Sequence, residues 1–258
     1  MGHRATVQYA GSGAKVSYSW STEDDLLTLS HDLAGTANDN AFTDTYTPAH
    51  QIATSAISNP EFQYLQPLAG TASYSTNGLN EYSSITPVGG TATSIGYDLN
   101  GNLNSDGNFI FAYDPENRLM TATKSGTAVA YAYDPLDRRT TKTVNGTATY
   151  FVHSGIDEIA EYDGSGNLLR RYVPSGTIDE NIAMVTAAGV KTFFHQDKTD
   201  SVVAMSDVNG NLTEGPYNYD SYGNGAPATG VPFKYTGQRL DPETWLYYYR
   251  ARYYCPPC

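Results

Sequence analysis

The sequence predicts an all-β protein made of tandem β-hairpins, and composition and repetition are the two observations behind this prediction. Its 258 residues include 22 tyrosines and 24 glycines but only 8 phenylalanines. Tyrosine and threonine favour the half-buried surface of a pleated sheet, whereas glycine and asparagine favour tight turns. This mixture indicates many short strands, and a chain of this length can bury a substantial core.

The repetition is a tyrosine–aspartate pair followed by turn residues. It reads YDLNGNL at residues 97–103, YDPENRL at 113–119 and YDGSGNL at 162–168. Two degenerate copies are expected around residues 18–26 and 46–52. The aspartates of the clear copies, which we take as the repeat turns, are Asp98, Asp114, Asp134, Asp163 and Asp220.

Each copy has the features of one hairpin. Residues 128–133 alternate in the manner of a strand, and the aspartate that follows can accept backbone N–H groups and begin an Asx turn. A proline next to it sets φ for the first corner, and the later asparagine or glycine accepts the left-handed conformation. A single hairpin cannot bury its apolar face, so we expect neighbouring hairpins to pair edge to edge.

The chain shows no linker or composition break that would separate domains. We expect one continuous β array, with degenerate repeats over residues 1–90 and regular repeats over 91–258. The best helical stretches, residues 23–27 and 181–185, are too short to predict helices. No stretch approaches the roughly 20 apolar residues of a membrane span.

Charge and the N-terminus restrict the possible partners. The formal charge is −12, from 27 acidic and 15 basic residues, which argues against a nucleic-acid surface. It is compatible with a basic partner, and equally with a charge that only keeps the protein soluble. Residues 1–7 lack the apolar core of a signal peptide. We therefore expect a chain that stays inside the cell, leaves it through a specialised secretion machine, or is part of something longer.

Over nearly its whole length, the chain resembles the RHS (rearrangement hotspot) and YD-repeat family of bacteria, whose animal relatives include the teneurins. The resemblance is weakest before about residue 97 and most specific near the C-terminus. The resemblance rests on HQDKTDSVV at 195–203, DVNGNL at 207–212, PFKYTGQRLD at 232–241 and ETWLYYYRARYY at 243–254. The last two segments match the RHS core signature. Its residues here are Tyr235, Gly237, Asp241, Tyr247, Tyr248, Arg250, Arg252, Tyr253 and Tyr254.

The resemblance implies a shell. In the family, repeats coil as a curved β-sheet ribbon into a hollow shell around a toxic C-terminal segment, and the signature lies near its plug. A toxin payload, bacterial origin and a secreted or cell-surface location are therefore expected. The Asp-Pro pairs at 114–115, 134–135 and 241–242 lack the glycine–leucine context of the family's self-cleaving aspartates, so none is taken as catalytic. Exposed edge hairpins should also favour self-association.

Other chemistry is weakly supported, and we expect no enzyme, cofactor or metal site. The sequence lacks a nucleophile elbow, a phosphate-binding loop and an HExxH motif. The five histidines lack ligand spacing and are expected at turns or on the surface. The DxNxN runs at 98–102 and 207–211 lack the glycine of a calcium loop, and the Cys255–Cys258 motif lacks the helix that redox chemistry uses.

The final aromatic run leaves two interpretations. As one strand, it would place Tyr247, Tyr249, Ala251 and Tyr253 on one face, and Tyr248, Arg250, Arg252 and Tyr254 on the other. Tyrosine beside arginine could bind a sugar or peptide, which would suit a cell-surface carbohydrate- or protein-binding module. Alternatively, both arginines pair with repeat aspartates and lock the plug in place.

Overall fold

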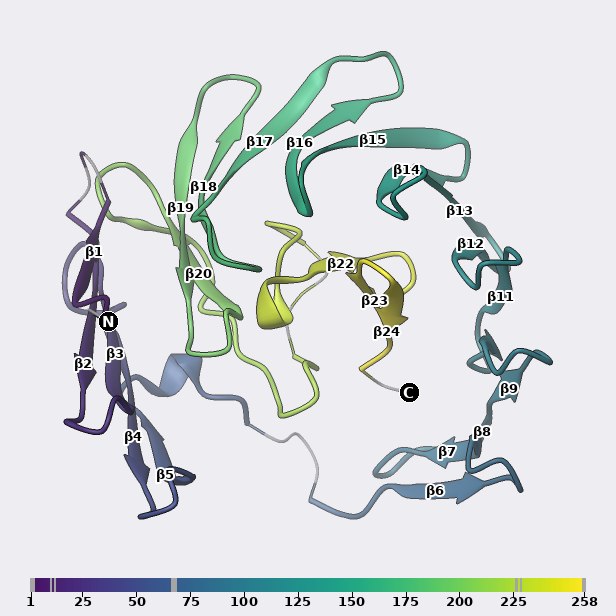
Figure 1. The fold of residues 1–258 in the computed structure, drawn as a ribbon, viewed down its shortest axis with the longest axis horizontal. Coiled ribbons are helices and arrows are strands. Elements are labelled where there is room, and N and C mark those ends of the chain that lie inside the picture. The colour runs from purple at the N-terminus through teal and green to yellow at the C-terminus, as the bar shows by residue number, and fades with distance from the viewer. Residues whose placement is uncertain are drawn as a thin grey trace. The chain divides into compact units, whose positions relative to one another are not determined.

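The computed structural model describes residues 3–9, 11, 13–65, 69–225, 227 and 229–256. These residues form 24 strands and two single-turn 3₁₀ helices, η1 (Pro60–Phe62) and η2 (Tyr235–Gly237), so the all-β prediction is confirmed. Figure 1 shows hairpins joined in sequence order by short turns. In the described part of the chain, no helix is long and apolar enough to cross a membrane.

The chain divides into two compact units, which we call unit 1 and unit 2. Unit 1 comprises Met1–Tyr64 and Leu169–Arg239, and unit 2 comprises Leu65–Leu168 and Leu240–Cys258. Each unit therefore joins an earlier stretch of repeats to a later one. The RHS core signature is divided between the two units.

Unit 1 contains two antiparallel sets of strands that follow sequence order. The first set is β1 (Thr6–Gln8), β2 (Lys15–Trp20), β3 (Leu26–Asp32), β4 (Asn40–Tyr46) and β5 (Ile52–Ile57). The second set is β17 (Leu168–Pro174), β18 (Asn181–Thr186), β19 (Lys191–Gln196), β20 (Val202–Ser206) and β21 (Leu212–Glu214).

Alternation along β19 divides the core of unit 1 in two. Phe193 packs with Val16, Leu29 and other residues of the first sheet, whereas Phe194 packs with Val202 and the segment that follows β21. Successive residues of a strand point to opposite faces, so one strand serves both clusters. The stretch 181–185, one of the two short helical candidates, lies within strand β18.

Unit 2 contains a three-stranded sheet, a longer meander and a short hairpin. The sheet is β6 (Ser73–Thr76), β7 (Tyr82–Thr86) and β8 (Thr93–Ser94). The meander is β9 (Gly96–Tyr97), β10 (Leu103–Ser105), β11 (Ile110–Tyr113), β12 (Leu119–Lys124), β13 (Thr127–Tyr133), β14 (Arg139–Val144), β15 (Thr147–Ser154) and β16 (Asp157–Asp163). The hairpin is β23 (Leu246–Tyr249) with β24 (Arg252–Tyr254), and β22 (Arg239–Asp241) crosses the boundary between the units.

Strand β13 shows how the repeat forms a sheet. Val129 and Tyr131 are buried while their neighbours are exposed, as the alternation predicted. Tyr131 lies opposite Lys142 of β14 in the antiparallel register. The buried side chains join Phe109, Phe111 and other apolar residues in the core of unit 2.

The repeat turns share one geometry, seen clearly at Asp114. Its N–H donates to the carbonyl oxygen of Arg118 at 3.1 Å, and the N–H of Asn117 donates to its carbonyl oxygen at 3.0 Å. Asn117 is left-handed, with φ of 62°. The third residue after the aspartate thus always needs a residue that tolerates positive φ.

The degenerate copies use the same turn with different chemistry. Ser21 and Thr47 replace the aspartate, and their hydroxyls accept N–H groups from the residues two and four positions later. The predicted copies around 18–26 and 46–52 are therefore confirmed as hairpin turns. Asn77, Asp197 and Asp207 form three more such turns, which the tyrosine–aspartate pattern missed because no tyrosine precedes them.

The final aromatic run is not one strand, so its predicted faces were wrong. The chain reverses at Arg250, whose φ is 59°, and Tyr248 pairs with Tyr253 while Tyr247 pairs with Tyr254. Directly paired residues share a face of an antiparallel hairpin. The turn escaped detection because it carries neither the glycine nor the asparagine that usually indicates positive φ.

Candidate functional site

The centre of the candidate site is a buried group of ions that joins the signature to the repeats within unit 2. Asp241 Oδ2 lies 2.5 Å from Arg139 Nη1, and Asp241 Oδ1 lies 3.1 Å from Lys142 Nζ. Lys142 also lies 3.0 Å from Glu243. The side chains of Arg139 and Asp241 have no exposed surface. We call Asp241, Arg139 and Lys142 the signature lock.

Aromatic rings enclose the arginine of the lock. Its Cζ atom lies 4.3 Å from the ring centroid of Tyr248, 4.9 Å from that of Phe151, 5.4 Å from that of Tyr131 and 5.8 Å from that of Tyr253. Ring faces attract a guanidinium and do so more strongly when water is excluded. They therefore offset part of the cost of burying this charge.

Two signature tyrosines also hold Arg139 through their hydroxyls. The Arg139 backbone N–H donates to the Tyr248 hydroxyl at 2.9 Å, and Nη1 donates to the Tyr253 hydroxyl at 3.2 Å. Both rings lie on one face of the β23–β24 hairpin because the residues are paired. Burial raises the pKa of Tyr253 well above its ordinary value, so its hydroxyl stays neutral.

The remaining signature residues of unit 2 lie around this centre. Tyr247 is buried, and its ring centroid is 6.4 Å from that of Tyr254. Arg250 is half-buried and Arg252 is exposed, and both line a cleft of about 560 Å³ beside the turns of the first two clear repeats. The signature lock pairs the acid of the signature, Asp241, with the arginine of a repeat strand, Arg139. The pairing of Arg250 and Arg252 with repeat aspartates, one of the two interpretations of the sequence, stays a prediction.

The signature residues of unit 1 form a tight turn. Tyr235 donates its hydroxyl to the carbonyl oxygen of Ser221 at 2.9 Å. Gly237 has φ of 68°, and a Cβ there would lie 2.1 Å from the carbonyl oxygen of Asp179, so only glycine fits. Tyr235 and Gly237 therefore both contribute to the packing of this turn.

Beside this turn, Lys234 is buried with its Nζ 3.5 Å from the Tyr217 ring centroid. Burial lowers the pKa of Lys234 to about 8. Its Nζ also donates to the carbonyl oxygen of Thr229 at 3.2 Å, so the ammonium packs within the unit 1 turn region.

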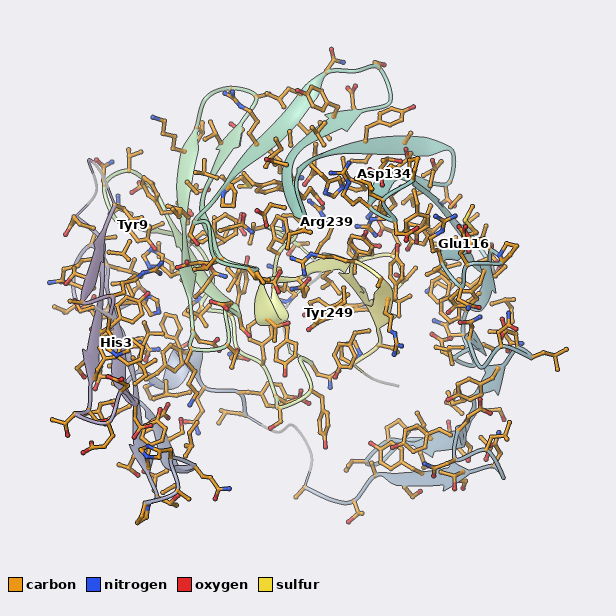
Figure 2. The ribbon with its side chains drawn as sticks, in the orientation of Figure 1. His3, Tyr9, Glu116, Asp134, Arg239 and Tyr249 are labelled. Carbon is orange, nitrogen blue, oxygen red and sulfur yellow. The ribbon has the colours of Figure 1, made fainter. Side chains whose placement is uncertain are left out.

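The carboxylates of the repeat turns are occupied by hydrogen bonds. Asp134 Oδ1 accepts the N–H groups of Leu136 and Arg138 at 2.9 and 3.0 Å, and its Oδ2 accepts Arg138 Nε at 2.7 Å. The side chain four residues later plays the same part at the other turns. These pairs are Asp98–Asn102, Asp114–Arg118, Asp163–Asn167 and Asp220–Asn224. Asp134 and Glu116 mark two of these turns in Figure 2.

These hydrogen bonds favour the ionised acids. The side chains of Asn102, Arg138 and Asn167 are the main cause that lowers the pKa values of Asp98, Asp134 and Asp163. At the calcium-like runs, the amide nitrogens of Asn102 and Asn211 donate to the carboxylates of Asp98 and Asp207 at 2.9 and 3.0 Å. Within the described residues, no group of three or more potential metal ligands is found.

The tyrosine of the repeat has a role that the sequence analysis missed. Its hydroxyl donates to a carbonyl oxygen five residues after the turn residue of an earlier repeat, which ties one hairpin to another. The bonds are Tyr46 to Leu26 at 2.8 Å, Tyr113 to Leu103 at 2.9 Å, Tyr133 to Leu119 at 2.7 Å and Tyr219 to Val202 at 2.6 Å. The available signal was the use of tyrosine rather than phenylalanine before the tyrosine–aspartate turns.

Two histidines correct the prediction that all five lie at turns or on the surface. His31 and His195 are buried in unit 1, with their Nδ1 atoms 3.3 Å apart. His195 Nε2 lies 2.9 Å from the Ser206 hydroxyl. Burial lowers the pKa of His31 to about 4 and that of His195 well below its ordinary value, so both are neutral. The residues are buried because they alternate inward on β3 and β19.

The C-terminal cysteine motif is only partly described. Strand β24 ends at Tyr254, and Cys255 packs against the core of unit 2 and is disulfide-bonded. Cys258 lies outside the described residues.

Comparison with known proteins identifies the fold and its family. A sequence profile described as Teneurin YD-shell matches residues 68–256, which is most of the chain. The chain belongs to the teneurin YD-shell family. The predicted membership in the RHS and YD-repeat group is thereby confirmed, and the paired hairpins with their buried signature are the YD-shell fold in this chain.

Curated relatives of this YD-shell chain are bacterial nucleases. It is 29% identical over 174 residues to the tRNA3(Ser)-specific nuclease WapA of Bacillus spizizenii. It is 30% identical over 174 residues to the tRNA(Glu)-specific nuclease WapA of Bacillus subtilis subsp. natto. Each match covers 63% of this chain but only 7% of the nuclease.

Solved structures with the same fold are toxin complexes. A Photorhabdus luminescens Tc holotoxin pore has a TM-score of 0.64 at 14% identity, over 98% of this YD-shell chain and 17% of the matched chain. A TcdB2–TccC3 complex without its hypervariable C-terminal region has a TM-score of 0.61 at 14% identity, over 96% and 17%. The chain thus spans only a small part of the length of these proteins, and the likeness to the solved structures is one of fold.

Proposed function

We propose that this chain is a wall segment of a shell that encloses or presents a C-terminal toxin, and that it has no catalytic role of its own. The family supports this assignment, as do relatives named as nucleases and structures named as toxin complexes. The cargo would be a separate segment. We also propose that this protein is bacterial and is secreted or displayed at the cell surface through specialised export.

The observation that carries the proposal is the signature lock. A fully buried acid of the signature is held by two cations of a repeat strand and covered by aromatic rings. Burying such ions costs free energy unless each charge is well paired and hydrogen-bonded. The arrangement therefore fixes the signature segment at one specific position. Such a fixed position suits a segment that must stay attached to the wall of the shell.

The turns of the repeats agree with a structural role. Their carboxylates are used by the turn itself, so the acids most abundant in the pattern have no spare capacity for acid–base chemistry. We propose that residues 1–90 form the degenerate part of this wall and residues 91–258 its regular part with the signature.

Protease protection tests the proposal. The complete reading frame that contains residues 1–258 should be expressed and its protein digested under native conditions, with fragments identified by mass spectrometry. We expect a segment beyond residue 258 to resist digestion in the intact protein. The variant Asp241→Asn should make that segment susceptible, whereas Glu61→Gln, an exposed charge change in unit 1, should leave it protected.

Two outcomes would contradict the first part of the proposal, the enclosure of a cargo segment. A reading frame that ends at residue 258 leaves no cargo segment in this polypeptide. A downstream segment digested as fast in the native protein as after denaturation is not enclosed. A direct activity of residues 1–258 on RNA would contradict the second part, that this chain itself is not catalytic.

A second candidate is a carbohydrate- or protein-binding module. It is favoured by one exposed aromatic pair, Tyr74 and Tyr82, whose ring centroids lie 5.1 Å apart on the β6–β7 hairpin. Exposed rings of this kind can stack on a sugar or contact a protein. Saturable binding on a glycan array that is lost in Tyr74→Ala would support it, and a blank array would remove the carbohydrate version.

A further inference from the structure

Unit 1 contains a cleft of about 650 Å³ that the shell assignment does not use. Three stretches of the chain form its walls: the strands β1 to β3, the β17–β18 connection and the β19–β20 turn. His3 and Tyr9, both lining residues, lie along the first of these stretches in Figure 2. Aromatic side chains and carboxylates both line the cleft, and Tyr18, Trp20, Glu180 and Asp200 are among them.

The chain's own Arg4 shows how this cleft holds a cation. Its guanidinium donates to both carboxylate oxygens of Glu180, with Nη2 at 3.0 Å from Oε2. The Arg4 Cζ atom lies 5.9 Å from the Tyr18 ring centroid. A bidentate pair over an aromatic face is a favourable environment for a guanidinium.

The charges of the cleft do not balance. Arg4 is paired with Glu180, and Lys198 is paired with Asp44 through oxygens at 2.6 and 2.8 Å. Asp197 is engaged by the N–H groups of its own turn. In the part of the chain that the structure describes, the Asp200 carboxylate has neither a hydrogen bond nor an ion pair.

The surroundings of Asp200 disfavour an isolated negative charge. Burial, followed by the nearby charges of Glu180 and Asp197, raises the pKa of Asp200 to about 6. A second cation in the cleft would relieve this repulsion. The net charge of −12 on the whole chain also draws a basic partner toward it.

We propose that this cleft is a binding site for an arginine or lysine side chain of a basic peptide segment, with Asp200 as its anchor and the aromatic wall of Tyr18 beside it. The ligand is peptide rather than nucleic acid, because the unpaired charge of the cleft is negative. The occupant that we propose is a basic segment of a separate partner protein. The site does not depend on the enclosure proposal, since all its residues belong to unit 1.

Titration calorimetry on the full chain with a tetra-arginine peptide at pH 7.5 and low salt tests this site. The variant Asp200→Asn keeps the shape of the side chain, and asparagine tolerates the left-handed conformation found there, with φ of 61°. We expect this variant to bind about tenfold more weakly, the loss of one hydrogen bond to a charged group. The matched control Glu61→Gln removes an exposed acid of unit 1 outside the cleft and should bind as tightly as the unmodified chain.

The pH profile distinguishes an anchor from a structural residue. Because the ionised carboxylate binds the cation, affinity for tetra-arginine should fall as pH decreases through about 6, and Asp200→Asn should remove this dependence. Equal affinity of Asp200→Asn and the unmodified chain would overturn the proposal. So would equal binding of tetra-glutamate or of a single-stranded oligonucleotide, and so would binding of calcium chloride in place of the peptide.

The complete reading frame tests whether the occupant is a separate partner. Binding of tetra-arginine with equal strength to residues 1–258 and to the complete polypeptide is expected for a separate partner. Binding to residues 1–258 but not to the complete polypeptide would show that a segment of the same polypeptide fills the cleft, and would overturn the partner assignment. Failure of the protease-protection test leaves these affinities unaffected, so the two proposals can fail separately.

Discussion

Arg139 Nη1 and Asp241 Oδ2 lie 2.5 Å apart, and neither side chain has exposed surface. Arg139 opens a repeat strand, whereas Asp241 belongs to the RHS core signature. The pair joins two parts of unit 2 that are separated by about a hundred residues of chain. Because both charges are desolvated, each partner becomes costly as soon as the other is lost.

The lock predicts a strong coupling between its members. Asp241→Asn should lower the free energy of unfolding by about 3–5 kcal/mol, because it leaves a buried guanidinium with a neutral partner. Arg139→Met should cost a similar amount alone, but the double variant should cost much less than the sum. Urea unfolding of the four proteins measures the coupling, and additive losses would show that the two charges do not depend on each other.

The tyrosine ties predict an effect of single hydroxyl groups. Tyr133→Phe removes the hydroxyl that donates to the Leu119 carbonyl oxygen and contacts the Tyr253 hydroxyl, and should cost about 1–2 kcal/mol. Tyr150→Phe alters an exposed tyrosine of the same unit and should cost nearly nothing. Urea unfolding provides the comparison. Equal effects of the two changes would argue that the ring, and not its hydroxyl, stabilises the repeat.

The left-handed turn position predicts a clear rank among substitutions. Asn80 has φ of 62° and is exposed. Asn80→Val should lower the free energy of unfolding by about 1–2 kcal/mol, because a β-branched residue is strained in this conformation, and Asn80→Gly should be nearly neutral. Leu79→Val at the neighbouring exposed position, where φ is negative, is the control. A loss there as large as that of Asn80→Val would point to side-chain contacts rather than backbone strain.

The buried histidine pair predicts a loss of stability at mildly acidic pH. Both folded pKa values lie below the unfolded value near 6.5, so the unfolded chain binds more protons as pH falls below it. The stabilisation is therefore complete above about pH 6.5 and decreases toward pH 4, by up to about 1.4 kcal/mol per pH unit for each histidine.

Urea unfolding between pH 7.5 and 5 tests this slope. His31→Phe should reduce this slope, because it removes one of the two titrating rings. The neighbours of the two rings, which include Phe42, Tyr9 and Ser206, are uncharged. His50→Gln changes an exposed histidine and should keep the slope. Identical pH dependence in the unmodified chain and His31→Phe would exclude the pair as its cause.

Strand β5 predicts self-association. It ends the first sheet of unit 1, and its residues 52–56 are all exposed, so one edge offers unpaired backbone groups. Light scattering should show a mass that rises with protein concentration. Ile52→Lys places a charge on this edge and should reduce the rise, whereas a monomer at all concentrations would show that the edge is protected.

The predictable part of this protein follows from local rules. Asx turns at Asp114 and Asp134, the strand at 128–133 and the sequential hairpins all result from neighbouring residues acting on one another. Prediction of turns from residue type fails where the turn contains residues that rarely adopt positive φ. The reversal at Arg250 was therefore missed, and with it the true faces of the last tyrosines.

The sequence by itself determined the all-β class, the repeat unit and the resemblance to the YD-repeat family, because each depends on short-range patterns that recur. Only the tertiary structure decided which charges and rings meet. The Arg139–Asp241 pair, the His31–His195 pair and the unpaired Asp200 all depend on residues far apart in the chain. No spacing rule anticipates such pairs, since packing brings them together and burial then sets how strongly each charge is felt.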